Sequence, residues 1–78
     1  MSLTYLVLED EPLIAMDLEF AFEDIGHRAV VAVNNAEANR AISDHQIAGA
    51  VLDVSLGDGE TCEPTARALS EQNIPFVL

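Results

Sequence analysis

Two apolar segments of this sequence each end in acidic residues. Residues 5–8 run into Glu9, Asp10 and Glu11, and residues 47–52 run into Asp53. If both segments are neighbouring strands of a parallel sheet, their ends lie about 5 Å apart and the acids converge on one point. Carboxylates this close repel one another, so the cluster holds either protons or a cation. A hard cation such as Mg²⁺ suits ligands that are all oxygen.

Each group of acids also has a purely structural explanation. Residues 9–11 precede a predicted helix, and acids interact favourably with the positive end of a helix dipole. Asp53 alone is explained equally well as a capping acid where a strand meets a loop. Their pairing at the ends of two adjacent strands is what favours a shared site at the carboxyl edge of a sheet, where open α/β sheets bind ligands.

The apolar pattern predicts alternating strands and helices. Strands are expected at residues 4–8, 29–33, 48–52 and 76–78, and helices at residues 12–25, about 36–43 and 61–72. This β-α-β-α-β-α-β order predicts a parallel sheet with right-handed crossovers. In the first helix, the stripe expected to face the sheet is Ile14, Leu18, Ala21, Phe22 and Ile25, widened by Leu13, Met16 and Phe20. The acids Asp17, Glu19, Glu23 and Asp24 are expected to face away.

Local signals fix the ends of these elements. Gly26 and Asn73 are predicted to end helices in a left-handed conformation. The pair Asn34-Asn35 is predicted to cap the second helix. The glycines of residues 55–59 predict a loop, with Asp58-Gly59 as its turn.

Length and charge narrow the function classes. A chain of 78 residues holds at most one domain. Its net charge is −11 and it contains no lysine, so we expect no nucleic-acid binding and no anionic-membrane binding by this segment. Cys62 is the only cysteine, which rules out an internal disulfide and fits the cytoplasm, the location we expect. No membrane span and no signal peptide are visible.

Four motifs resemble those of one family, the receiver domains of two-component response regulators. Leu-Glu-Asp-Glu-Pro at residues 8–12 resembles their acidic pair, and Val-Leu-Asp at residues 51–53 resembles their phosphoacceptor site. Leu-Gly-Asp-Gly at residues 56–59 resembles a short form of the turn that follows, and residues 73–78 resemble the start of the fourth strand. The order and spacing of all four make the resemblance specific.

The resemblance implies a flavodoxin-like, doubly wound α/β fold, of which residues 1–78 form the N-terminal part of a single receiver domain. The implied strand order is 2-1-3-4, without the fifth strand and the last two helices. It also implies a phosphorelay role, in which Asp53 takes a phosphoryl group from a histidine kinase or phosphotransfer protein. The implied Mg²⁺ ligands are Glu9, Asp10, Asp53 and the backbone carbonyl of Ser55, with Glu9 acting largely through water. A signalling role of this kind is not that of a metabolic enzyme.

The sequence also departs from the family pattern. The family places a hydroxyl residue after the fourth strand and a lysine after the fifth, and this chain has neither position and no lysine. The alternative function is therefore a pseudo-receiver, a protein-interaction module that is not phosphorylated. A phosphatase or nuclease with an Asp-x-Asp motif is disfavoured, because the matching residues are Asp53-Val54-Ser55. Without a fifth strand, we expect self-association through the edge of the fourth.

Overall fold

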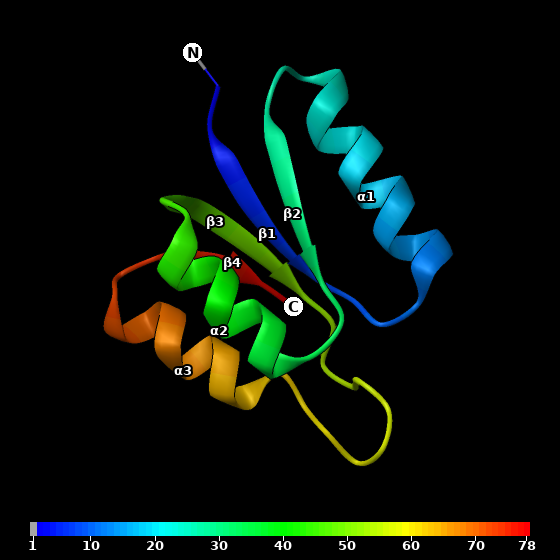
Figure 1. Cartoon of the computed structure of the whole chain (residues 1–78), viewed down its shortest axis with the longest axis vertical. Coiled ribbons are helices and arrows are strands. Elements are labelled where there is room, and N and C mark those ends of the chain that lie inside the picture. The colour runs from blue at the N-terminus through cyan, green and yellow to red at the C-terminus, as the bar shows by residue number, and fades with distance from the viewer. Residues whose placement is uncertain (1) are drawn as a thin grey trace.

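The computed structural model describes residues 2–78, which form four strands and three helices in strict alternation (Figure 1). The strands are β1 (Thr4–Leu8), β2 (Arg28–Ala32), β3 (Ile47–Leu52) and β4 (Phe76–Val77). The helices are α1 (Pro12–Asp24), α2 (Asn35–Asp44) and α3 (Glu63–Glu71). The predicted elements are confirmed, with ends that differ by at most two residues. None of these three helices is long and apolar enough to cross a bilayer.

All four strands are parallel and lie in the order β2-β1-β3-β4, as the family resemblance implied. Leu8, the last residue of β1, pairs with Ala32 on one side and with Leu52 on the other. The three strands therefore end at the same level. Because of this register, the residues that follow β1 and β3 come out at one edge of the sheet.

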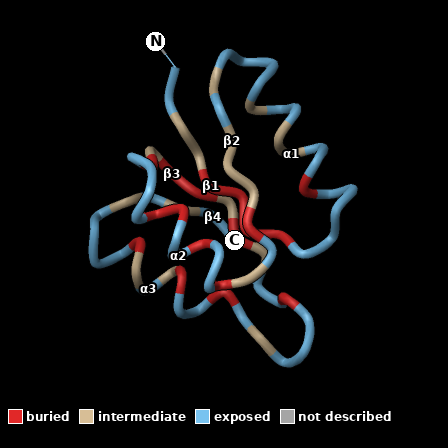
Figure 2. The backbone as a smooth tube through the Cα atoms, viewed as in Figure 1, coloured by how far each residue is buried: buried red, intermediate tan, exposed pale blue. Residues whose placement is uncertain are grey.

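The core lies between the sheet and the layer formed by α2 and α3. Leu6, Leu8, Ala50 and Leu52 point from β1 and β3 into this layer and are almost completely buried. Figure 2 shows the buried positions gathered along β1, β3 and the inner sides of α2 and α3, whereas most of α1 is exposed. Burial of these aliphatic side chains is the main force that holds the carboxyl edge together.

The helix ends follow the predicted chemistry. Gly26 has φ of 84°, and its N–H and that of His27 donate to the carbonyls of Glu23 and Phe22, so α1 ends in a Schellman motif. Asn73, at φ 58°, ends α3 in the same way. Pro64 lies in the first turn of α3, where its missing N–H costs nothing.

The predicted stripe on α1 is only partly right. Ala15 is the residue of α1 that is buried, and Leu18, Glu19 and Phe22 are half-buried, whereas Ile14 and Ile25 are exposed. The helix packs on β1 and β2 and leaves the same face of β3 and β4 uncovered. Leu13, Met16 and Phe20, which were expected to widen the stripe, are exposed as well. Of the predicted stripe, Phe22 borders the uncovered part of the sheet.

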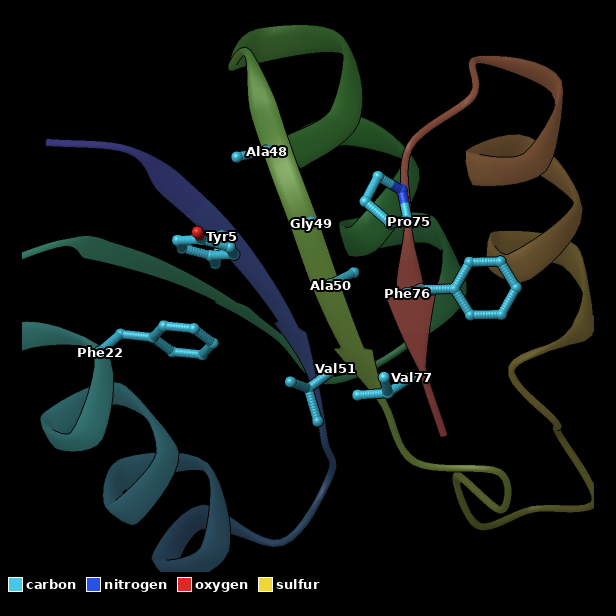
Figure 3. A pocket seen from close by; sticks show the side chains of 9 residues that line it. All are labelled: Tyr5, Phe22, Ala48, Gly49, Ala50, Val51, Pro75, Phe76 and Val77. Carbon is cyan, nitrogen blue, oxygen red and sulfur yellow. The ribbon is translucent and has the colours of Figure 1, made fainter.

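This uncovered face forms an apolar hollow of about 350 Å³ (Figure 3). Tyr5 lies flat over Gly49, where a Cβ atom would stand 3.3 Å from the ring, and Phe22 stacks on the Tyr5 ring at 4.6 Å. Val77 points into the same face, whereas Phe76 points away towards α3. The hollow is a surface of the sheet and is separate from the acidic edge.

Candidate functional site

The backbone places Glu9 and Asp53 next to each other. The N–H of Glu9 donates to the Ala32 carbonyl at 3.0 Å, and the N–H of Asp53 donates to the Leu8 carbonyl at 2.9 Å. Both bonds continue the sheet ladder by one residue beyond the strands. The positions of these two acids are therefore set by the sheet, the most rigid part of the fold.

The predicted convergence of Glu9, Asp10 and Asp53 is present in the structure. One carboxylate oxygen from each residue lies within 4.8 Å of the other two. Glu9 is buried, at 8% exposure, Asp53 is half-buried and Asp10 is exposed. The cluster is thus open to solvent on one side, as a site for an incoming ion must be. Glu11, the fourth acid, uses its N–H to bond the Glu9 carboxylate at 3.2 Å.

The environment of Glu9 raises the pKa of its carboxyl group above the usual value. The largest cause is desolvation by burial, and the neighbouring carboxylates of Asp53 and Asp10 add to it, against a lowering by the Glu11 N–H. A buried acid beside two others therefore favours either a proton or a cation.

The loop after β3 folds back on itself. Ser55 pairs with Thr61 in an antiparallel bridge, and the N–H groups of Leu56 and Cys62 donate to the carbonyls of Glu60 and Val54. In this pattern the bridge residues do not bond each other, so their carbonyls point outwards. Among residues 2–78, no hydrogen bond is made to the Ser55 carbonyl. It is thus free to serve as a ligand.

The turn of this loop lies against the acidic cluster. Gly57, Asp58 and Gly59 all have positive φ, at 80°, 52° and 75°. A Cβ atom at Gly57 would stand 3.2 Å from Asp10 Oδ2. The prediction of a turn at Asp58-Gly59 is confirmed, because the N–H of Glu60 donates to the Gly57 carbonyl at 2.9 Å and closes a turn around these two residues. Its three left-handed residues bring the backbone close to Asp10.

A second polar group, centred on Asn35, was not predicted from the sequence. Asn34 and Asn35 were expected to form one cap, but only Asn34 caps α2, by accepting the Glu37 N–H at 2.8 Å. Asn35 is buried and bonds Glu60, Thr61 and Thr65, which lie more than twenty residues away. The signal in the sequence was a second asparagine in a helix's first turn, where it is a poor helix former.

The donor set fits Mg²⁺. It contains carboxylates and a free carbonyl, which are hard oxygen ligands, and Mg²⁺ needs only one or two carboxylates because it keeps several waters. Burial, and after it the neighbouring Asp53 and Asp10, raises the pKa of Glu9, and a cation at the cluster would offset both effects. Asp10 and Asp53 are accessible enough to bind an ion directly, whereas the buried Glu9 suits contact through water.

Comparisons with known proteins agree with this geometry. The phyllosphere-induced regulator PhyR of Methylorubrum extorquens is 43% identical over 63 residues, which are 78% of this chain and 24% of that protein. The solution structure of SdrG from Sphingomonas melonis Fr1 is 43% identical, with a TM-score of 0.84, over 95% of this chain and 64% of that one. PhyR from Bartonella quintana, solved in complex with the anti-sigma factor NepR, is 29% identical, with a TM-score of 0.87, over 100% of this chain and 33% of that one.

The chain thus spans about a quarter of the length of the curated relative and less than two thirds of the SdrG chain. No protein-family model matches it. Solved receiver domains of response regulators also match nearly all of its residues. The order β2-β1-β3-β4, the acids at the ends of β1 and β3 and these similarities lead to one conclusion: the chain belongs to the receiver domains of response regulators and corresponds to part of such a domain.

Proposed function

We propose that residues 1–78 are the N-terminal part of a single receiver domain and that Asp53 is its phosphoacceptor. The observation that carries the proposal is the convergence of Glu9, Asp10 and Asp53 at the carboxyl edge of the sheet. In this role the chain is a signalling regulator, and its chemistry is limited to its own phosphorylation.

In the proposed reaction, a carboxylate oxygen of Asp53 attacks the phosphorus of a phosphohistidine on a histidine kinase or phosphotransfer protein. The new bond joins that oxygen to phosphorus, the phosphorus–nitrogen bond breaks, and the released imidazole nitrogen takes up a proton. Phosphoryl transfer needs mainly positioning and charge stabilisation from the protein. The sheet supplies the positioning, because Asp53 and Glu9 are both held by ladder bonds to β1 and β2.

Asp10, Asp53 and the Ser55 carbonyl would hold Mg²⁺, with Glu9 acting through water. Bound there, the ion neutralises the carboxylates and the phosphoryl oxygens. Gly57 keeps the turn of the loop close to Asp10 without a side chain, so that an incoming phosphoryl group has room.

The second candidate is a pseudo-receiver that acts through protein contacts alone. Within these 78 residues there is no lysine that could pair with a phosphoryl group on Asp53. The complex of the Bartonella quintana relative with NepR supports a protein partner for either candidate. For this chain, an anti-sigma factor is a proposed partner, as is a histidine kinase.

Incubation with acetyl phosphate separates the two candidates. A phosphoacceptor takes up one hydroxylamine-labile phosphoryl group, slowly and only with Mg²⁺, and Asp53→Asn abolishes the uptake. Asp58→Asn is the matched control, because it removes an acid of the same loop that lies outside the cluster. Uptake that persists in Asp53→Asn, or that does not need Mg²⁺, would contradict Asp53 as the phosphoacceptor.

A further inference from the structure

The buried side chain of Asn35 joins α2 to the loop that follows the phosphoacceptor. Its Nδ2 donates to Glu60 Oε1 at 2.6 Å and to the Thr61 carbonyl at 2.7 Å, and its backbone N–H donates to Glu60 Oε1 at 2.9 Å. Its Oδ1 accepts from the Thr65 hydroxyl at 2.6 Å and the Thr65 N–H at 3.3 Å. We call Asn35, Glu60, Thr61 and Thr65 the clasp.

The clasp is a closed polar network. Asn35 is 8% exposed and Thr65 is fully buried, and among residues 2–78 no buried side-chain oxygen or nitrogen lacks a partner. The bonds between Asn35 and Thr65 are buried, and those from Asn35 to Glu60 and Thr61 are partly buried. Removing one partner would leave a polar group of Asn35 unpaired. The clasp therefore fixes the returning arm of the loop against α2 and α3.

Glu60 and Thr61, held by the clasp, in turn hold the part of the loop that carries Ser55. Thr61 is the bridge partner of Ser55, and Glu60 accepts the N–H of Leu56 through its backbone carbonyl. One residue further on, Gly57 lies beside the Asp10 carboxylate. A continuous chain of contacts thus runs from Asn35 through the loop to the acidic cluster.

We propose that Asn35 is a positioning residue for the metal and phosphoacceptor site: by clasping Glu60 and Thr61, it holds the Ser55 carbonyl and Gly57 at the acidic cluster. The proposal rests on the proposed function, because it assumes that the loop contributes a ligand. It also assigns a role to Glu60, whose carboxylate accepts two hydrogen bonds and lies outside the acidic cluster.

Asn35→Asp tests the proposal sharply, because its two effects on metal binding oppose each other. The variant keeps the acceptor for Thr65 but replaces the Nδ2 donor with a carboxylate oxygen that faces Glu60 Oε1 and the Thr61 carbonyl. An added negative charge alone would strengthen Mg²⁺ binding, whereas loss of the clasp should weaken it about tenfold, as changes in groups that orient metal ligands do. Asn34→Asp is the matched control, since it adds the same charge one residue away and keeps a good cap.

Two measurements on the 78-residue chain decide the matter. Titration with Mg²⁺ by NMR gives the dissociation constant, and amide hydrogen exchange at Leu56 and Cys62 reports the loop without any metal. We expect weaker Mg²⁺ binding and faster exchange for Asn35→Asp, with neither change for Asn34→Asp. In Glu60→Gln, which keeps the Oε1 acceptor, the amides of Leu56 and Cys62 should exchange at the rate of the unmodified chain. In Glu60→Ala they should exchange as fast as in Asn35→Asp.

Equal Mg²⁺ affinities for Asn35→Asp and Asn34→Asp would overturn the positioning role, even if the exchange rates differ. Unchanged exchange in both Asn35→Asp and Glu60→Ala would show that the clasp does not order the loop. Glu60→Ala keeps the test open if Asn35→Asp fails to fold, because Glu60 lies on the half-buried outer side of the clasp. If the unmodified chain binds no Mg²⁺ at residues 8–11 and 52–56, the proposed function itself fails, which is a different result.

Discussion

Gly57 and Asp10 are in close approach: the Cβ of any side chain at position 57 would stand 3.2 Å from Asp10 Oδ2. This contact links the loop after β3 to the acids after β1 without a hydrogen bond. It also predicts the effect of a methyl group. Gly57→Ala should lower the free energy of unfolding by about 1–2 kcal/mol, because φ is 80°, and should weaken Mg²⁺ binding by moving Asp10.

The structure offers a matched control for this substitution. Gly59→Ala meets the same backbone strain, at φ 75°, but nothing lies within 4 Å of its Cβ position. Chemical denaturation and Mg²⁺ titration of both variants separate strain from crowding. If the two variants lose Mg²⁺ affinity equally, the approach to Asp10 has no role in the site.

The raised pKa of Glu9 predicts how stability depends on pH. The folded chain holds the Glu9 proton to a higher pH than the unfolded chain does, so this group lowers stability as pH rises through its folded pKa. Acidification from neutral pH towards 4.5, the ordinary value, should therefore raise the melting temperature. Addition of Mg²⁺ at neutral pH should also raise the melting temperature, because the ion would balance the charge of Glu9 and of the neighbouring Asp53 and Asp10.

Glu9→Gln isolates this contribution from the other acids. The variant should melt at a higher temperature than the unmodified chain at pH 7, and the difference should shrink as the pH falls. Melting curves measured by circular dichroism at several pH values are sufficient. A lower melting temperature for Glu9→Gln at pH 7 would mean that the Glu9 carboxylate stabilises the fold.

Most of the fold follows from the sequence, because its signals are local. The apolar runs, Gly26 and Asn73 each act within a few residues, and the elements and helix ends that they predict are confirmed. The acidic cluster was also predictable, since parallel strands that end together bring their next residues together. The clasp was not predictable, because Asn35 finds its partners through the packing of α2 on α3. The packed face of α1 was predicted only in part, because Ala15 is buried where Ile14 was expected, while Leu18 and Phe22 pack as predicted.

The absence of lysine predicts slow phosphorylation. Asp53 and Mg²⁺ would leave part of the charge on the phosphoryl oxygens without a side-chain donor. Loss of one such donor slows comparable reactions about a hundredfold or more, so we expect the 78-residue chain to react at least that much more slowly than a receiver domain that carries the lysine. Phosphorylation by acetyl phosphate, followed by mass spectrometry, measures the rate. Rapid stoichiometric uptake would contradict the expectation.

The uncovered face of the sheet predicts self-association of this polypeptide. Val77 is 61% exposed, Leu78 is 72% exposed, and β4 is an edge strand next to the apolar hollow. Open edges of this kind pair with other chains. Because the net charge is −11, repulsion opposes pairing, and added salt should therefore strengthen it.

Sedimentation velocity at low and high salt tests this prediction. The unmodified chain should form larger species as its concentration and the salt rise. Val77→Lys places a charge on the uncovered face and should shift the equilibrium towards monomer. Glu71→Lys, on the exposed end of α3, should cause no such shift. A folded monomer at both low and high salt would contradict the prediction, because salt screens the charge that opposes pairing.

The most direct test of the central claim is an Mg²⁺ titration followed by NMR, with the unmodified chain, Asp53→Asn, Asp10→Asn and the control Asp58→Asn. We predict saturable shifts confined to residues 8–11 and 52–56 in the unmodified chain and in Asp58→Asn. In Asp53→Asn and Asp10→Asn the same shifts should require a markedly higher Mg²⁺ concentration. Absent or uniformly distributed shifts in a folded sample, or equal affinity in all four proteins, would contradict a metal-dependent phosphoacceptor site at Asp53.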